Sequence, residues 1–388
     1  MEQQNSAGPS EDIDNTFFLN YKDLCPWWPI IASAIVMVSI SVLGIFLNSF
    51  LIFVTARTKS LHGTANVFLA LTSAFEVLHE FGHFFFLATA LSGNCFVPYR
   101  NAFRFLALSL FGLCASTLSM LFTGFDRFYC VLFPMKYNHI NFWLYIVTGL
   151  LLCTVPSVYL LFLYWQISEQ MPSMQVTGSI GDLIWKGGYA YSVYRNAKLG
   201  CTSATMLVYI VVACVIRAQQ KSNSSAVSSQ HRRIFFSLLV IVLFNVGGYY
   251  LISMFYVFMP SLNGQVVLWD VRMALSIPAN LCGASNAPIL FMTSNEYRKA
   301  FKKQCQNISS LLFSSASRSS AIQPANFVLQ TTKNQSPQPP LNVPKRRATI
   351  LPANSMEWKF VPANSLGRKT ILKRPSVPLE RVEEEIAN

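Results

Sequence analysis

Four ionisable side chains recur at spacings of three and four residues within one apolar stretch: Glu76, His79, Glu80 and His83. On a helix, these spacings place all four along one face. The run from His79 to His83 also matches the zinc-protease pattern, in which two histidines hold a metal beside a glutamate base. A catalytic zinc needs a third protein ligand, and the Asp-Gly pair that intramembrane proteases use for this purpose does not occur in the sequence. We therefore predict no metal and prefer a ligand pocket or an internal hydrogen-bond network, with an intramembrane zinc metalloprotease as the alternative.

A second charged constellation, Asp126-Arg127, ends another apolar stretch and is followed by Pro134, Lys136 and Tyr137. Such a pair at the end of a hydrophobic helix can meet a soluble partner, or it can anchor the helix end at the membrane interface. A membrane setting is indicated by the composition, because 52% of the residues are hydrophobic and only 12% are charged. A soluble domain has about 25% charged residues.

Seven apolar runs are long enough to cross a bilayer as helices, for which about 20 apolar residues suffice. They lie near residues 28–56, 65–91, 98–125, 142–165, 195–216, 234–259 and 265–292. Barrel strands alternate in polarity and do not give such runs, so only helices can satisfy the backbone in lipid here. The predicted fold is an all-α membrane protein with a seven-transmembrane-helix bundle.

Basic residues predict the orientation of this bundle. Fifteen of the 30 Lys and Arg residues follow position 293, whereas five of the six charged residues among the first 27 are acidic. The positive-inside rule then places the N-terminus outside and the C-terminus in the cytoplasm. We expect an extracellular tail (1–27), a seven-helix bundle (28–292), an amphipathic inner-leaflet helix (293–305) and a disordered basic tail (306–388). Because the residues after position 293 carry +9 of the net charge of +13, a nucleic-acid partner need not be invoked.

The predicted amphipathic helix brings Tyr297 and Phe301 to one face, one turn apart. Cys305 follows as a candidate palmitoylation site. In the tail, Thr349 and Ser376 follow basic clusters and are candidate phosphorylation sites, where a phosphate would reverse the local charge. The alternative is a basic tail that binds anionic lipid without modification.

Further pocket candidates are Arg104 in the third apolar run and Asp270 in the seventh. Arg272, also in the seventh run, is another candidate, with snorkelling to the interface as the preferred interpretation. The third run has no acidic residue in its first half or middle, which disfavours a biogenic amine, and Arg104 favours a ligand with an anionic or hydrogen-bonding group. Among the cysteines on the predicted outer side, Cys25, Cys95 and Cys201, one disulfide is expected.

Three stretches together resemble a rhodopsin-like G-protein-coupled receptor, and within that group the nematode chemoreceptors called serpentine receptor class SX. They are Gly44-Ile-Phe-Leu-Asn48, Asp126-Arg127 with Val131-Leu-Phe-Pro134-Met-Lys-Tyr137, and Ser294-Asn-Glu-Tyr-Arg-Lys-Ala-Phe301. The likeness covers about residues 30–303. It implies a plasma-membrane receptor of chemosensory or neuropeptide type, with no enzymatic activity and no cofactor. An orphan transporter or scaffold is a further alternative.

The resemblance also implies roles and partners. An extracellular ligand of unknown class and a heterotrimeric G protein are expected, besides the lipid bilayer, with kinases and arrestin as possible partners of the tail. Arg127 would reach the G protein, and Asp126 would hold it at rest by a charge-assisted pair. Phe128 stands where the wider group has tyrosine, and Pro134 and Tyr137 belong to the coupling loop.

Other positions depart from the pattern of the group. Helix seven reads Asn286-Ala-Pro288-Ile-Leu-Phe291, with an added alanine and with Phe291 in place of tyrosine. In helix six, Phe244 and Tyr249 are the candidates for the aromatic switch. For the disulfide that holds helix three in this group, Cys95 is the candidate, with Cys201 as its nearest possible partner.

Overall fold

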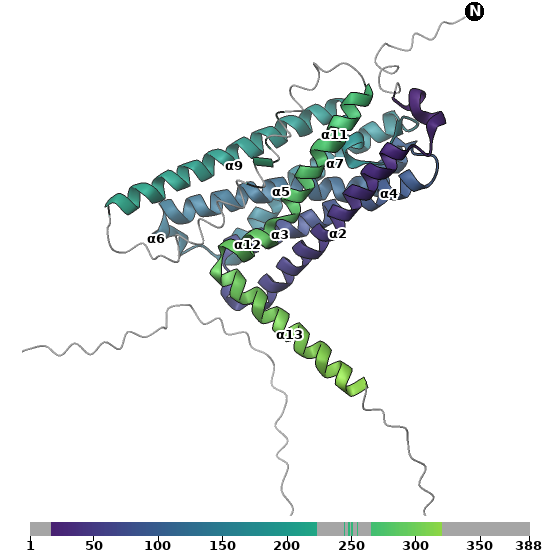
Figure 1. Cartoon of the computed structure of the whole chain (residues 1–388). Helices are drawn as coiled ribbons and strands as arrows, with labels where there is room; N and C mark the ends of the chain where they lie inside the picture. Colours follow the sequence, from purple (N-terminus) through teal and green to yellow (C-terminus); the bar gives the residue numbers. More distant parts are fainter. Residues whose placement is uncertain are drawn as a thin grey trace, which may run out of the picture. The chain divides into compact units, whose positions relative to one another are not determined.

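The computed structural model describes residues 17–222 and 265–319, together with five single positions at 244, 247, 248, 250 and 254. Helices make up most of these residues, and two short strands, β1 (Val97–Pro98) and β2 (Gln175–Val176), pair antiparallel between two loops (Figure 1). The predicted all-α architecture is confirmed.

Six of the seven predicted crossings have counterparts among the described helices. Four are single helices that are long and apolar enough to cross a membrane: α2 (Trp28–Arg57), α5 (Tyr99–Leu132), α7 (Phe142–Gln170) and α9 (Gly188–Ser222). Two are helix pairs, α3 (Thr64–Glu80) with α4 (Gly82–Leu91) and α11 (Gln265–Ala284) with α12 (Asn286–Thr293). The remaining crossing, predicted at 234–259, lies outside the described residues apart from the five single positions.

The shorter elements connect or flank these helices. They are η1 (Lys22–Leu24), η2 (Lys59–Leu61), α6 (Pro134–Tyr137) and α8 (Ile180–Trp185), while α13 (Asn295–Ser319) follows α12. Figure 1 shows α13 leaving the bundle at the end where α12 meets α2.

Helix α5 lies at the centre of the bundle and packs against α3, α7 and α9 (Figure 1). Its contact with α3 depends on Gly112, where a Cβ atom would lie 2.5 Å from the Phe75 carbonyl oxygen and 2.7 Å from the His79 nitrogen. Small residues permit such close approach of helices in membranes. The backbone around His79 therefore lies directly against α5.

The second crossing is interrupted at Phe81, between α3 and α4. Gly82 begins α4 facing Ser109 of α5, and a Cβ atom there would overlap the Ser109 side chain. Ser109 in turn donates a hydrogen bond of 2.5 Å to the His79 carbonyl oxygen. The interruption is thus held against α5 by a polar contact as well as by close packing.

Helix α13 begins near the predicted position but continues to Ser319, whereas the sequence predicted an end near residue 305. No proline or glycine occurs between 306 and 319 to stop it. Tyr297 and Phe301 are buried in a cluster with Leu51, Tyr209 and Leu290. The apolar face predicted for this segment therefore packs on the bundle.

The disulfide joins Cys25 to Cys95, with their Cα atoms 6.0 Å apart, and Cys201 is a free thiol. The Cys95–Cys201 pairing was therefore wrong. An aromatic cluster explains the observed pair: Phe17 contacts the rings of Trp27, Phe96 and Trp269 at 5.8–6.1 Å between centroids. It draws the segment before α2 onto the loop between α4 and α5, where Cys95 lies.

Candidate functional site

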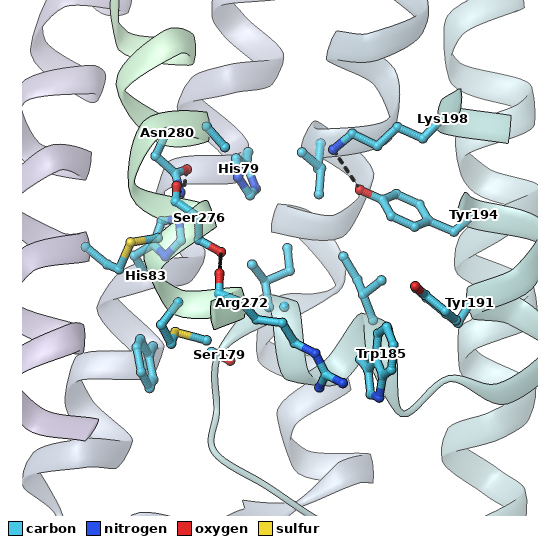
Figure 2. Close-up of a pocket in the computed structure, with 18 residues that line it drawn as sticks. His79, His83, Ser179, Trp185, Tyr191, Tyr194, Lys198, Arg272, Ser276 and Asn280 are labelled. Carbon is cyan, nitrogen blue, oxygen red and sulfur yellow. Dashed lines mark hydrogen bonds between the residues drawn. The ribbon is translucent and has the colours of Figure 1, made fainter. Parts of the chain in front are cut away.

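A pocket of about 80 Å³ opens between the helices near the end of the bundle at which α5 begins. Figure 2 shows side chains from α4, α9, α11 and the α8 loop pointing into it. Its polar wall consists of His79, His83, Ser179, Tyr191, Tyr194, Lys198, Arg272, Ser276 and Asn280. Its apolar wall includes Met37, Phe86, Leu113, Ile180, Ile184, Trp185, Met273 and Ala279.

The two histidines of the sequence motif form one side of this pocket. Their rings are buried, with centroids 5.4 Å apart. His83 Nε2 lies 3.2 Å from Asn280 Oδ1, and because an amide oxygen can only accept, this nitrogen carries the proton. Ser109 Oγ lies 3.3 Å from His79 Nδ1. The histidines are therefore fixed by α5 and α11, as expected of a pocket wall.

Glu76 and Glu80 share the histidine face but do not line the pocket. Both are buried, and Glu80 Oε2 lies 4.0 Å from His83 Nε2. A Cβ atom at Gly44 would come within 3.1 Å of the Glu80 carboxyl group, so the glycine provides the space that this group occupies. The two carboxyl groups thus form an internal layer behind the pocket wall.

No group of three or more His, Cys, Asp and Glu side chains in the described residues is arranged to hold a metal ion. In particular, the histidine rings make their polar contacts with Ser109 and Asn280. The described geometry of the motif is that of a hydrogen-bond network.

The loop before α9 covers one side of the pocket through α8. The Asp182 carboxylate accepts a hydrogen bond of 2.9 Å from the Thr177 backbone nitrogen, and Ser179 caps α8. The hydroxyl groups of Tyr99 and Tyr164 donate to the carbonyl oxygens of residues 183 and 184 at 3.0 and 3.2 Å. These contacts, with the β1–β2 pair, fix the position of Trp185 over the pocket.

Two cationic side chains enter the pocket from opposite helices (Figure 2). Arg272 of α11 is 6% exposed, and its Cζ atom lies 3.5 Å from the centre of the Trp185 ring. Lys198 of α9 donates from Nζ to the Tyr194 hydroxyl at 3.0 Å. Arg272 therefore does not snorkel, and that interpretation was wrong.

The structure contradicts the assignment of Arg104 and Asp270 to the pocket, because both are exposed and neither lines it. Arg104 shares an exposed stripe of α5 with Phe105 and Leu108, at helical spacing, on the side turned away from the bundle. Sequence reasoning missed Lys198 and Trp185. A lysine inside a predicted apolar crossing was the available signal for Lys198.

At the other end of α5, Asp126 is fully buried and Arg127 lies beside it. Arg127 donates to Asp126 Oδ2 from Nε at 3.0 Å and from Nη2 at 2.5 Å. Asp126 Oδ1 accepts from Thr64 Oγ1 at 2.8 Å and from the Tyr137 hydroxyl at 3.0 Å. The carboxylate therefore joins α3, α5 and α6 in one cluster, which we call the Asp126 cluster (Thr64, Asp126, Arg127 and Tyr137).

Tyr137 lies outside the membrane-spanning segments and remains neutral. Burial first, and then the nearby Asp126 carboxylate, raise the pKa of its phenol well above the ordinary value. The hydroxyl therefore keeps the proton that it donates to Asp126. The other two predicted loop positions contribute less, since Phe128 is half-buried on α5 and Pro134 is exposed at the start of α6.

In helix seven, Asn286 is buried, and its Nδ2 atom donates to the Gly283 carbonyl oxygen at 3.4 Å. Asn48 Nδ2 donates to the same oxygen at 3.2 Å. Pro288 lies within α12, whereas Phe291 is 40% exposed and contacts the Phe301 ring of α13. The proposed switch positions are thus divided between the bundle interior and its surface.

The remaining predicted positions are exposed or not described. Phe244 is 59% exposed, and Tyr249 lies outside the described residues. Cys305 is an exposed thiol on α13, while Thr349 and Ser376 also lie outside the described residues.

A family model described as the serpentine type 7TM GPCR chemoreceptor Srsx matches residues 41–305, about two thirds of the chain. The match includes the whole Asp126 cluster. It also includes every residue of the pocket except Met37. No curated protein matches the chain significantly. The chain belongs to the Srsx family of serpentine seven-transmembrane chemoreceptors and is a multi-pass membrane receptor of the GPCR type.

Proposed function

We propose that the chain is a plasma-membrane chemoreceptor that passes ligand binding in the pocket to a heterotrimeric G protein at the Asp126 cluster. In the orientation that the positive-inside rule predicts, the N-terminus and the pocket face the exterior, and α6 and α13 face the cytoplasm. The observation that carries the proposal is the ion pair between the buried Asp126 and the half-buried Arg127, at the opposite end of α5 from the pocket.

The continuous helix α5 connects the two sites. Leu113 lines the pocket and Asp126 follows thirteen residues later, a separation of about 20 Å along a helix. A ligand shifts the receptor toward an active state only as far as it prefers that state over the resting one. In the resting state Asp126 holds Arg127, and activation releases this arginine to contact the G protein.

The test does not require a known ligand, because basal signalling can be measured. We expect Asp126→Asn to weaken the hold on Arg127 and raise basal G-protein activation, read with a panel of Gα dissociation biosensors. Arg127→Ala, alone or combined with Asp126→Asn, removes the contacting arginine and abolishes that signal. Arg57→Ala is the control, since Arg57 is exposed at the same end of the bundle and stacks on Phe53.

Surface expression of each variant is measured beside the biosensor signal. A raised basal signal that persists in the Asp126→Asn, Arg127→Ala double variant would contradict the assigned role of Arg127. Loss of signal in Arg57→Ala at normal expression would show that the assay reports general damage to this end of the bundle.

A further inference from the structure

We propose that the ligand is a small organic acid whose carboxylate binds between Arg272 and Lys198. This inference rests on the proposed function for the meaning of the pocket, and it adds the chemical class of the molecule that the pocket takes. The observation behind it is the charge of the pocket wall in the described residues.

Two cationic side chains line the pocket, and none of its lining residues is Asp or Glu. The elements that form the wall carry five acidic residues, and each lies elsewhere. Asp126 follows Leu113 by thirteen residues on α5 and belongs to the Asp126 cluster. Glu76 and Glu80 are buried behind the histidines, and the charge of Glu76 acts on Lys198. Asp182 accepts hydrogen bonds from Thr177 within its loop, and Asp270 is exposed. The wall therefore attracts an anion and disfavours an amine.

The position of Arg272 suits recognition of a carboxylate. Its guanidinium group stacks on the Trp185 ring, and this contact uses the flat face of the group. The five N–H donors of a guanidinium point outward in its plane and match the two oxygens of a carboxylate. Stacking therefore holds Arg272 in place and is compatible with a bidentate contact along its edge.

Lys198 adds a second positive charge together with a hydroxyl group. Its ammonium donates to the Tyr194 oxygen, so the hydroxyl proton of Tyr194 points to another acceptor. Both groups line the pocket. An oxygen of the ligand can accept from either of them, which gives the pocket donors on two opposite sides (Figure 2).

The size of the pocket limits the acid. About 10–15 Å³ of this measure holds one water molecule, so the 80 Å³ of the pocket corresponds to about five to eight waters. An acid with roughly five to eight non-hydrogen atoms fits without displacing α8. Its apolar part would lie against Met37, Phe86 and Leu113, which belong to the apolar wall of the pocket.

The test measures direct binding to the purified full-length receptor as a thermal shift. The probes are short aliphatic and aromatic carboxylic acids and their matched primary amides. A ligand that binds only the folded state raises the melting temperature, and the shift grows with the logarithm of the ligand concentration relative to its Kd. We expect acids to stabilise the receptor and amides of the same shape to have no effect. Because no G protein is present, this result is independent of the Arg127 signalling test.

Variants then locate the contact. Arg272→Gln is expected to weaken acid binding at least about tenfold, as loss of a charge-assisted contact does, and Lys198→Gln several-fold. Arg272→Lys keeps the charge but loses the paired N–H donors of the guanidinium, so its affinity for the acid is expected to lie between those of Arg272→Gln and wild type. This variant replaces Arg272→Gln in the test if Arg272→Gln does not fold. Arg104→Gln is the matched control, because Arg104 is exposed and lies outside the pocket. Equal binding of acids and amides, acid binding unaffected by Arg272→Gln and Arg272→Lys, or no binding of any acid would overturn the proposal.

Discussion

Asp126 Oδ1 accepts from two hydroxyl groups, Thr64 on α3 and Tyr137 on α6, which also contact each other. Removing one donor from a charged acceptor costs about 1.5–3 kcal/mol, and any part of this cost that is specific to the resting state shifts the population toward activity. We therefore expect Thr64→Val and Tyr137→Phe each to raise basal G-protein signalling, measured with the same biosensors.

Tyr129→Phe is the control for the loss of a tyrosine hydroxyl in the same region. The Tyr129 ring lies 6.2 Å from the Tyr137 ring, but its hydroxyl is not part of the Asp126 cluster. If Thr64→Val and Tyr137→Phe both leave basal signalling at the wild-type level, the two hydroxyl groups do not hold Asp126 in a resting state.

At this scale, residue spacing predicted much of the site. The i, i+4 pattern placed His79 and His83 on one buried face, and the end of an apolar run marked Asp126 and Arg127. The pocket cations were not predictable in the same way. Arg104 and Arg272 both lie in predicted crossings, and only the rotation of each helix in the bundle decides which one is buried. Trp185 is placed by contacts from Tyr99 and Tyr164 with its loop, which are distant in sequence.

Among the elements, the Cys25–Cys95 disulfide connects the segment before α2 with the loop before α5. Closing a long loop typically stabilises a fold by 2–4 kcal/mol. We expect Cys95→Ser and Cys25→Ser to lower the melting temperature of the purified receptor, and the double variant to add little to either change. Cys201→Ser is the control, because Cys201 is free. A loss of stability for Cys201→Ser as large as that for Cys95→Ser, with no loss for Cys25→Ser, would contradict the role of the Cys25–Cys95 disulfide.

Hydropathy predicted where helices lie because a membrane-spanning backbone has almost no other solution. It did not predict the interruptions at Phe81 and Ser285, because these depend on neighbours. At Phe81 the helix is interrupted where Gly82 packs against Ser109 of α5. Ser285 separates α11 from α12 close to Gly283, whose carbonyl oxygen accepts hydrogen bonds from Asn48 and Asn286. Helix α13 exceeds its predicted length because no residue stops it, and periodicity alone does not fix a helix end.

For the whole molecule, the uneven distribution of charge predicts an orientation in the membrane that can be tested without any ligand. Fifteen of the 30 basic residues follow α12 and only Lys22 precedes α2, so the positive-inside rule places the N-terminus outside. The chain has acceptor sequences for N-glycosylation at Asn223, Asn307 and Asn334, all on the proposed cytoplasmic side. An acceptor is modified only where it reaches the lumen during synthesis, so we expect none of these asparagines to carry a glycan.

A single substitution supplies the positive arm of this test. Ala7→Thr gives Asn5 an acceptor sequence in the N-terminal tail, and we expect this variant alone to shift to a higher apparent mass that a glycosidase reverses. Asn307→Gln is expected to leave the wild-type band unchanged. A glycosidase-sensitive wild-type band that disappears in Asn307→Gln would place α13 outside. In that case the Asp126 cluster would face the exterior, and it could not be the site at which a G protein binds.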